Sequence, residues 1–332
     1  MMEFLFADWL DTPVWLWLSF IGIVTVLLVI DLGVVHRKDH EIGVVESLVT
    51  SAVYMAIGLA FGGWVWWYMG ATAGMNYLTG FVIEKSLAMD NVFVIAMIFT
   101  YFGIPRLYKH RVLFWGILGV IVLRAIMIGL GASLVQQFSW VLYVFAAFLI
   151  VTGAKMWLFA DKEYDVASNP VLKFVRRHFR VTDRPHEQRF WVRLPDPRTG
   201  KPALYMTPLM LALLMVEIVD LVFAVDSVPA IFAITTDPFI VYTSNIFAIL
   251  GLRALYFALA AMVHRFHYLK YALAVLLVFI GSKIFVADAL GLAKVPPPVS
   301  LGITFAILAA GVGYSLWKTR GKVEPDWPAP AR

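Results

Sequence analysis

The chain has 332 residues, of which 61% are hydrophobic and 15% are charged, and its mean hydropathy is +0.81. This composition excludes an ordinary soluble domain, because the apolar runs are each long enough for the roughly 20 residues that cross the hydrocarbon layer of a bilayer. Cysteine is absent, which excludes disulfides, thiolate metal sites and iron–sulfur clusters.

Hydropathy predicts an all-α polytopic membrane protein. The N-terminal residues include Glu3, Asp8 and Asp11 but no Lys or Arg before the first apolar run. They therefore lack the basic start of a cleaved signal peptide, and we expect the first span to be retained. About nine transmembrane helices are predicted, at residues 14–34, 43–68, 77–103, 107–131, 138–158, 207–236, 239–263, 270–290 and 297–317.

The distribution of basic residues predicts the orientation of these spans. The net charge is +5, and the loops on one side of the predicted membrane hold 21 Lys and Arg residues, whereas Lys294 is alone on the other side. Cytoplasmic loops carry the excess of Lys and Arg in membrane proteins. We therefore expect a multi-pass protein with its N-terminus outside and its C-terminus in the cytoplasm.

Two matching acidic segments lie inside predicted spans. EKSLAMDNV at residues 84–92 and DLVFAVDSV at residues 220–228 each carry two carboxylates six residues apart. A charge at the centre of a membrane helix costs about 2.5–3.5 kcal/mol on insertion scales. Four acids in two matching places are therefore poorly explained as accidents, and a cationic substrate is expected.

The similarity between the two halves extends beyond the acidic segments. Arg124 in LRAI matches Arg253 in LRAL, and Lys155 in GAKM matches Lys283 in GSKI. Each unit contains three spans, and an odd number of spans makes the second copy enter the membrane from the opposite side. Inverted-topology repeats of this kind are typical of secondary transporters.

This interpretation divides the chain into five parts. Two N-terminal transmembrane helices are followed by two three-helix repeats with a basic cytoplasmic loop between them, and a C-terminal transmembrane helix and tail complete the chain. The predicted boundaries are 1–76, 77–158, 159–206, 207–290 and 291–332.

The cytoplasmic loop, residues 159–206, is the one substantial segment outside the predicted spans. Its run KFVRRHFR, from Lys173 to Arg180, is strongly basic. No nucleic-acid-binding module is recognisable there and the loop adjoins the membrane, so anionic lipid headgroups are the expected partner and nucleic acid is not. Because the loop separates the two repeats, a hinge or regulatory role is a further interpretation.

The polar atoms near the acidic segments suit a hard cation. Carboxylate, carboxamide, hydroxyl and carbonyl oxygens favour Mn²⁺, Mg²⁺ or Ca²⁺ over softer metals. Every histidine falls in a predicted cytoplasmic loop, which argues against an intramembrane zinc, copper or haem site. The histidines are His36, His40, His110, His178, His186, His264 and His267.

Helix geometry limits how many acids can share one ion. Six residues rise about 9 Å on a regular helix, so Glu84 and Asp90 cannot easily contact the same cation. Pro229 has no N–H for the carbonyl of Val225 and so can open the helix beside Asp226. The residues predicted to bind the metal are Asp90, Asn91, Asp226 and Ser227.

The other acids, Glu84, Glu217 and Asp220, are predicted to surround the ligands as entry or proton-carrying groups, with Arg124 and Arg253 beside them. Intramembrane acids and bases are equal in number. Adding a dication to a nearly neutral site of low dielectric would be costly unless protons left it, which favours exchange of metal for protons. The balancing bases are Lys85, Arg124, Lys155, Arg253 and Lys283.

These motifs together carry a family resemblance. The paired acidic segments, the DLGVVHRK end of the first span at residues 31–38, the LRA motif and the GSK motif resemble the TerC family of integral membrane proteins, in particular its Alx-like branch. The resemblance implies manganese export across the bacterial inner membrane. Glu217 stands opposite Phe81 of the first repeat, which departs from a symmetric site. The residues that match the family pattern are Glu84, Asp90, Asn91, Asp220, Asp226 and Ser227.

Three other interpretations compete with a transporter site. The acids could form structural salt bridges with Arg124, Arg253, Lys85 and Lys283. The protein could be a membrane scaffold that does not transport, and that delivers metal to exported proteins or supports tellurite or stress resistance. A membrane redox enzyme is the weakest alternative, since cysteine is absent and the histidines lie in loops. We expect no enzymatic activity and no cofactor, with Mn²⁺ as the transported substrate; the sequence does not define the oligomeric state.

Overall fold

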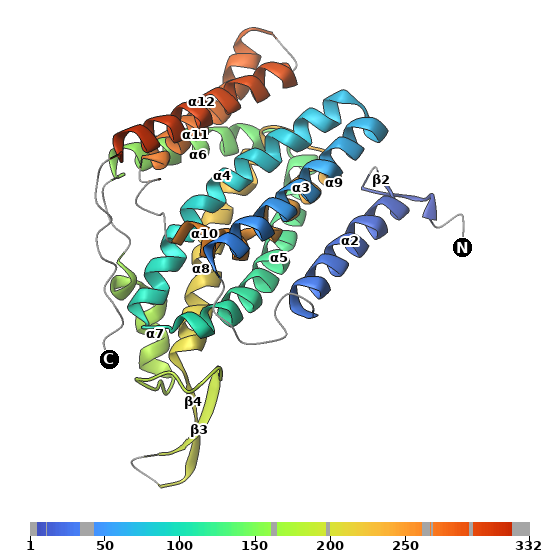
Figure 1. Cartoon of the computed structure of the whole chain (residues 1–332). Helices are drawn as coiled ribbons and strands as arrows, with labels where there is room; N and C mark the ends of the chain where they lie inside the picture. Colours follow the sequence, from blue (N-terminus) through green and yellow to red (C-terminus); the bar gives the residue numbers. More distant parts are fainter. Residues whose placement is uncertain are drawn as a thin grey trace.

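The computed structural model describes residues 5–10, 12–33, 43–160, 165–196, 200–260, 266, 268–291 and 295–320. These residues fold mainly into long helices that pack side by side, and a β-hairpin projects from one end of the bundle (Figure 1). The helices of the first half are α2 (Val14–Gly33), α3 (Val44–Met69), α4 (Ala71–Tyr101), α5 (Arg106–Gln137) and α6 (Val141–Leu158). Those of the second half are α8 (Pro208–Phe232), α9 (Pro238–Leu250), α10 (Leu252–Ala260), α11 (Leu269–Ala289) and α12 (Pro297–Lys318).

Several of these helices have the length and composition of membrane spans. Six in the described part are long and apolar enough to cross a bilayer, namely α3, α5, α6, α8, α11 and α12. Large apolar side chains such as Trp67, Leu130 and Val222 point outward, as a lipid environment requires. The protein is therefore an integral, multi-pass membrane protein. The total of nine spans stays a prediction, because α2 and α9 are shorter apolar helices within the described residues and α4 carries three charged side chains, Glu84, Lys85 and Asp90.

The second repeat differs from the prediction in two places. The span predicted at 239–263 is two helices, because α9 ends at Leu250 and α10 begins at Leu252 after a turn at Gly251. The predicted opening of α8 at Pro229 is wrong, since this helix continues through the proline to Phe232. A glycine lowers helix stability by about 1 kcal/mol, and α9 ends just before Gly251. Helix α8, in contrast, continues through Pro229.

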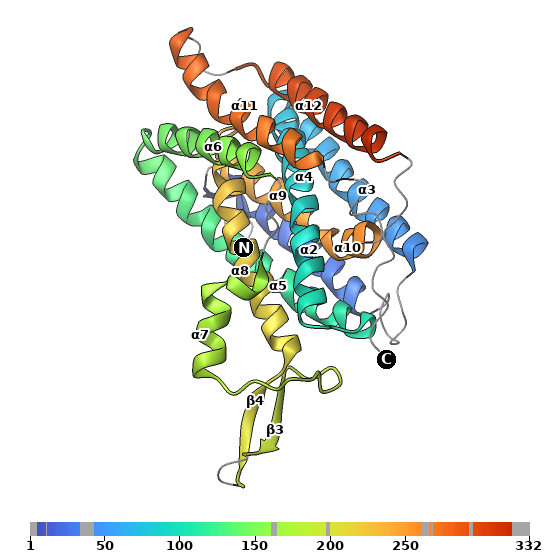
Figure 2. The same ribbon diagram turned by 90° about the vertical axis from the view of Figure 1, so that its left-hand side faces the viewer.

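The segment predicted as the 159–206 loop contains folded elements. It holds a 3₁₀ turn, η1 (Val166–Ser168), and the short helix α7 (Pro170–His178). Strands β3 (Trp191–Pro195) and β4 (Pro202–Met206) pair antiparallel, and Figure 2 shows this hairpin leaving the same end of the bundle as α7. We call this the loop end; α4 ends there, and α5 and α8 begin there. A second, two-residue pairing joins β1 (Asp8–Trp9) to β2 (Thr12–Pro13).

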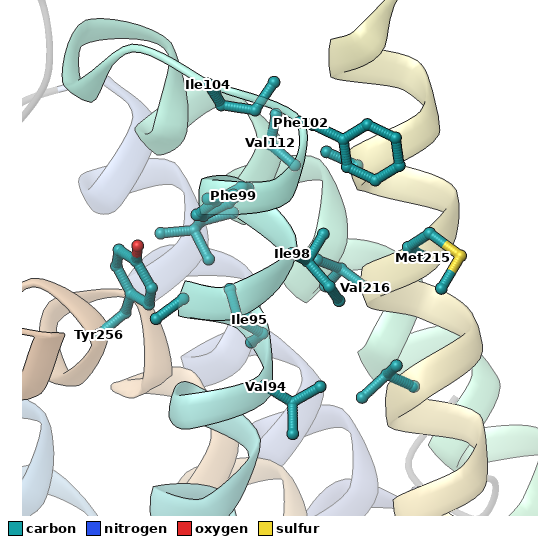
Figure 3. Packing of buried hydrophobic residues seen from close by; sticks show 14 of the residues in the cluster. Val94, Ile95, Ile98, Phe99, Phe102, Ile104, Val112, Met215, Val216 and Tyr256 are labelled. Carbon is teal, nitrogen blue, oxygen red and sulfur yellow. The ribbon is translucent and has the colours of Figure 1, made fainter. Parts of the chain in front are cut away.

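A large apolar cluster closes the loop end of the bundle. Side chains of α4, α5, α8 and α10 interlock there, with Ile98, Phe99 and Val112 fully buried. Figure 3 shows these residues beside Val216 of α8 and Tyr256 of α10. Apolar contacts therefore hold α4, α5, α8 and α10 together at the loop end.

Helices α6 and α11 cross at two glycines, one on each helix. Each glycine packs against the backbone of the other helix in the same way. A Cβ atom at Gly153 would lie 2.7 Å from the carbonyl oxygen of Ala274, and one at Gly281 would lie 2.5 Å from the carbonyl oxygen of Ala146. Gly153 follows Ala146 by as many residues as Gly281 follows Ala274. The two helices therefore run antiparallel at this crossing, and the contact is reciprocal.

Candidate functional site: a buried arginine between two acids

Arg124 of α5 lies at the centre of a buried polar cluster. Its side chain is 1% exposed and forms an ion pair through Nη1 with Oε1 of Glu84 on α4. Its Nη2 lies 3.1 Å from Oδ1 of Asp220 on α8, and its Nε lies 3.2 Å from Oδ2 of the same carboxylate. One guanidinium thus bridges the two acids that open the matching segments of the sequence.

Two neutral side chains complete the contacts around the Arg124–Glu84 pair. Asn245 of α9 donates from Nδ2 to Oε2 of Glu84 at 2.9 Å and accepts from Nη1 of Arg124 at 3.3 Å. Ser227 of α8 accepts from Nη1 of Arg124 at 3.0 Å. Both oxygens of Glu84 are therefore hydrogen-bonded, as a buried carboxylate requires.

Asn91 of α4 contacts the other acid of the cluster. Its Nδ2 donates to Oδ1 of Asp220 at 3.4 Å, while its Oδ1 is buried without a hydrogen-bond partner among the described residues. Asn91 itself is 3% exposed. We refer to Glu84, Asn91, Arg124, Asp220, Ser227 and Asn245 together as the central polar cluster.

The structure brings some of the predicted site residues together and places others elsewhere. Within the described residues, Asp90 and Asp226 have no hydrogen bond or ion pair to the central polar cluster. The charged neighbour of Asp90 is Lys270 of α11. The neighbours of Asp226 are Thr152 and Lys155 of α6. Six residues turn a helix through well over one revolution, so the two acids of each segment face different neighbours.

Two further basic residues were predicted near the acids. Lys85 forms no ion pair with the cluster in the described part of the chain; its Nζ donates to the carbonyl oxygen of Ala248 at 3.0 Å, near the end of α9. A cation is favourable at a helix C-terminus because carbonyl groups there lack intrahelical donors. Arg253 falls within α10, and its side chain lies outside the described part of the chain.

Glu217 lies one turn before Asp220 on α8 and packs against α5. A Cβ atom at Gly119 would come within 2.1 Å of Oε1 of Glu217, so a larger residue there would require the Glu217 carboxylate to move. Its Oε2 is buried and has no hydrogen-bond partner within the described residues. Apart from Asn91 Oδ1 and Glu217 Oε2, Thr304 Oγ1 on α12 is the one other buried side-chain atom of this kind in the described part.

A cavity of ≈ 10 Å³ adjoins the cluster on its loop-end side. Asn91 and Asp220 are the polar residues of its wall, which is otherwise apolar and includes Gly116 and Val120 of α5. This volume is about that of one water molecule. The described residues hold no group of three or more His, Asp or Glu side chains placed around one metal position. Glu84 and Asp220 are instead bonded to Arg124 and to the amides of Asn245 and Asn91.

Asn245 and Gly119 were not among the residues predicted from the sequence. Asn245 follows Thr243 and Ser244 inside an otherwise apolar span, and a polar side chain in such a span is a recognisable signal. Gly119 carried no signal alone, because its role depends on the carboxylate from α8 that lies against it.

Comparison with known proteins identifies the family. The sequence profile of the integral membrane protein TerC family matches residues 69–323. The chain belongs to the TerC family. The resemblance seen in the acidic segments and in the LRA and GSK motifs is therefore confirmed. No solved structure matches the chain.

Proteins of three organisms align with nearly the whole chain. A Myxococcus xanthus protein named uncharacterized membrane protein STKORF319 is 46% identical over 315 residues, covering 95% of this chain and 96% of that protein. The Escherichia coli K12 protein named putative membrane-bound redox modulator Alx is 47% identical over 325 residues, covering 93% of this chain and 98% of that protein. An uncharacterized membrane protein of Rickettsia bellii is 46% identical over 300 residues, covering 90% of this chain and 96% of that protein.

Proposed function

We propose that this TerC-family protein is a secondary transporter that exports a hard divalent cation, Mn²⁺, from the cytoplasm across the bacterial inner membrane. The observation that carries the proposal is the central polar cluster, in which Glu84 and Asp220 face one another across Arg124 inside apolar helices. Ionisable groups at such positions mark ion pathways in membrane proteins.

The inverted-repeat architecture belongs to the same proposal. It is supported by the reciprocal, antiparallel crossing of α6 and α11. It is also supported by Asn91 and Ser227, which match in the two acidic segments and which contact Asp220 and Arg124 respectively. Transporters of this architecture bind substrate near the bilayer midplane between the repeats. A discontinuous helix beside the site, here α9 and α10, is a further feature of such transporters.

The ion-pair contacts also fit the scaffold alternative, in which the acids only hold the bundle together. Arg124 pairs with both Glu84 and Asp220, as that alternative predicts. It leaves Glu217 unexplained, however, because a structural acid would be expected to have a partner for its buried oxygen. The name of the Escherichia coli relative mentions redox modulation, and this chain has no cysteine with which to perform thiol chemistry.

Proton exchange is the coupling mechanism that we propose for export. Carboxylates must be ionised to bind a metal, so the apparent Mn²⁺ affinity should rise with pH. Glu84 and Asp220 were predicted to carry the protons, and each would first have to lose its contact with Arg124. In proteoliposomes a proton gradient should then drive Mn²⁺ against its own gradient, whereas a uniporter would ignore the proton gradient.

Asp90 and Asp226 test the ligand set predicted from the sequence, which also includes Asn91 and Ser227. Asp90→Asn and Asp226→Asn should each abolish the Mn²⁺ tolerance that the protein gives to cells, with normal amounts of folded protein in the membrane, because removing a charge from the bilayer interior does not oppose insertion. If the acids are structural, the amount of folded protein should fall instead. Cell growth in Mn²⁺ and membrane-protein level, measured together, distinguish the two.

The loop end is proposed to contact anionic lipid headgroups. Helix α7 has Arg176, Arg177 and His178 in its last turn, while Leu172 and Val175 face the protein. Phe174, which precedes these basic residues, is exposed. A basic helix beside a membrane attracts anionic lipid with about 1 kcal/mol per basic side chain. Stabilisation of the purified protein by phosphatidylglycerol, lost in an Arg176→Gln/Arg177→Gln variant, would support this contact.

A further inference from the structure

The hydrogen bonds of Arg124 divide the central polar cluster into two unequal halves. Its Nη1 serves three acceptors, on Glu84, Ser227 and Asn245, and Glu84 receives a second bond from Asn245. Its Nε and Nη2 serve Asp220. Both oxygens of Glu84 and both oxygens of Asp220 are therefore bonded, and the two acids share the one positive charge of Arg124. The half around Glu84 has no buried acceptor without a partner among the described residues.

The other half has more acceptors than donors. Asp220 and Glu217 are one turn apart on α8, where side chains three residues apart are neighbours. Asn91 Oδ1 and Glu217 Oε2 both lack hydrogen-bond partners in the described part of the chain. Among the described residues, Arg124 is the one cation that forms an ion pair with Asp220, and it is shared with Glu84.

A cavity lies beside two of these acceptor residues, Asn91 and Asp220. Asn91 and Asp220 form part of its wall, together with Val216 and Val219 of α8. Glu217 is beside it on α8, with its carboxylate held against Gly119, in the same turn of α5 as the cavity residues Gly116 and Val120. The space of ≈ 10 Å³ accepts a water-sized occupant, and an ion without its hydration shell is of similar size.

We propose that Asn91, Glu217 and Asp220 form a binding site for a divalent cation on the loop-end side of Arg124. Two carboxylates balance the charge of a dication, and oxygen donors suit a hard ion. Arg124 keeps its bonds to Glu84, Ser227 and Asn245 when the ion binds and releases Asp220. The choice of Mn²⁺ as the ion depends on the proposed function, whereas the position of the site does not.

This assignment changes the roles of three residues. Asp220 and Glu217 were predicted to lie around the ligands, and they become ligands. Arg124 becomes a tethered cation that neutralises Asp220 when the site holds no ion, so that an unpaired carboxylate is not left buried. The second repeat supplies both acids, in agreement with the absence of an acid at Phe81 of the first repeat.

The test is the direct binding of Mn²⁺ to purified full-length protein in nanodiscs, followed by loss of the electron paramagnetic resonance signal of free Mn²⁺. Asn91→Leu and Glu217→Gln should each weaken binding by about tenfold or more, in the range seen for loss of groups around a metal. Thr304→Val is the matched control, because it also removes a buried atom without a partner, but on α12. Its Mn²⁺ affinity should equal that of the wild type.

Asn91→Asp is a second variant that tests the site even if Asn91→Leu does not fold. It adds a carboxylate facing the ion, so it should bind Mn²⁺ more tightly than the wild type, whereas a purely structural Asn91 would make this substitution harmful through repulsion from Asp220. Unchanged Mn²⁺ affinity in folded Asn91→Leu and Glu217→Gln, or weaker affinity in Asn91→Asp, would overturn the site.

Flux measured on the same samples separates this proposal from the proposed function. A wild type that binds Mn²⁺ through Asn91 and Glu217 but moves none across vesicles supports the site and rejects the transporter. A wild type that moves Mn²⁺, with binding unaffected in folded Asn91→Leu and Glu217→Gln, supports the transporter and rejects the site.

Discussion

The crossing of α6 with α11 and the central polar cluster place matching parts of the two halves in contact, but they do so differently. At the crossing, Gly153 and Gly281 meet the backbone of Ala274 and Ala146 in the same way. In the cluster, Glu84 accepts from Arg124 and Asn245, and Asp220 accepts from Arg124 and Asn91. Asp220 alone has a second acid, Glu217, one turn away on its helix, and an Asn91 oxygen without a partner lies on its side. The crossing is built from apolar and backbone contacts, and the cluster from charge.

This difference separates a structural role from a functional one. A reciprocal contact gives each half the same packing energy and needs no ionisable group. The cluster differs, because its described side chains include more carboxylates than cations inside an apolar bundle. This excess of negative charge lowers stability unless a ligand balances it. We infer that the crossing holds the two halves together and that the unequal charge is retained for a bound cation.

The largest expected effect comes from removing the cation of the cluster. Arg124→Gln leaves Glu84 and Asp220 buried without their shared partner, and breaking a buried ion pair from one side costs about 3–5 kcal/mol. The triple variant Arg124→Gln/Glu84→Gln/Asp220→Asn should recover much of this loss. Thermal unfolding in detergent measures both, and an Arg124→Gln variant as stable as the wild type would show that the ion pairs contribute nothing to the fold.

A smaller loss of stability is expected at the crossing, and there it should be equal in both halves. Gly153→Ala and Gly281→Ala each place a Cβ atom against a carbonyl oxygen, and overpacking of this kind typically costs about 1–3 kcal/mol. Gly63→Ala is the control, since nothing lies within 4 Å of a Cβ atom there. Clearly different unfolding temperatures for the Gly153 and Gly281 variants would contradict the reciprocal contact.

The smallest effect on stability is expected at the position where the halves differ. Gly119→Ala pushes a methyl group against the Glu217 carboxylate, which must shift to make room, so we expect a loss of about 1 kcal/mol. Glu217→Ala should remove that loss, because the two residues are in contact and their effects should not add. A double-mutant cycle with additive effects would place Glu217 away from Gly119.

Hydropathy located the apolar helices, because a bilayer imposes a length and a composition that one sequence displays by itself. The sequence also indicated that the acids matter, since an acid such as Glu84 stands out in an apolar run without any knowledge of the fold. What the sequence could not show is which acids converge. The bonds of Arg124 depend on helix rotation, and the contribution of Asn245 depends on α9 packing beside α4. The break at Gly251 was missed because the apolar run continues through it, and the β3–β4 hairpin because its short strands alternate weakly.

The most direct test of the central claim, that the unequal charge of the cluster serves to move a divalent cation, is Mn²⁺ flux in sealed vesicles that contain only this protein. We predict Mn²⁺ movement well above that of protein-free vesicles, lost in Glu217→Gln and kept in Thr304→Val, with all three proteins folded to the same extent. Mn²⁺ movement by the folded wild type that does not exceed that of protein-free vesicles would contradict the account and favour a scaffold held together by its buried ion pairs.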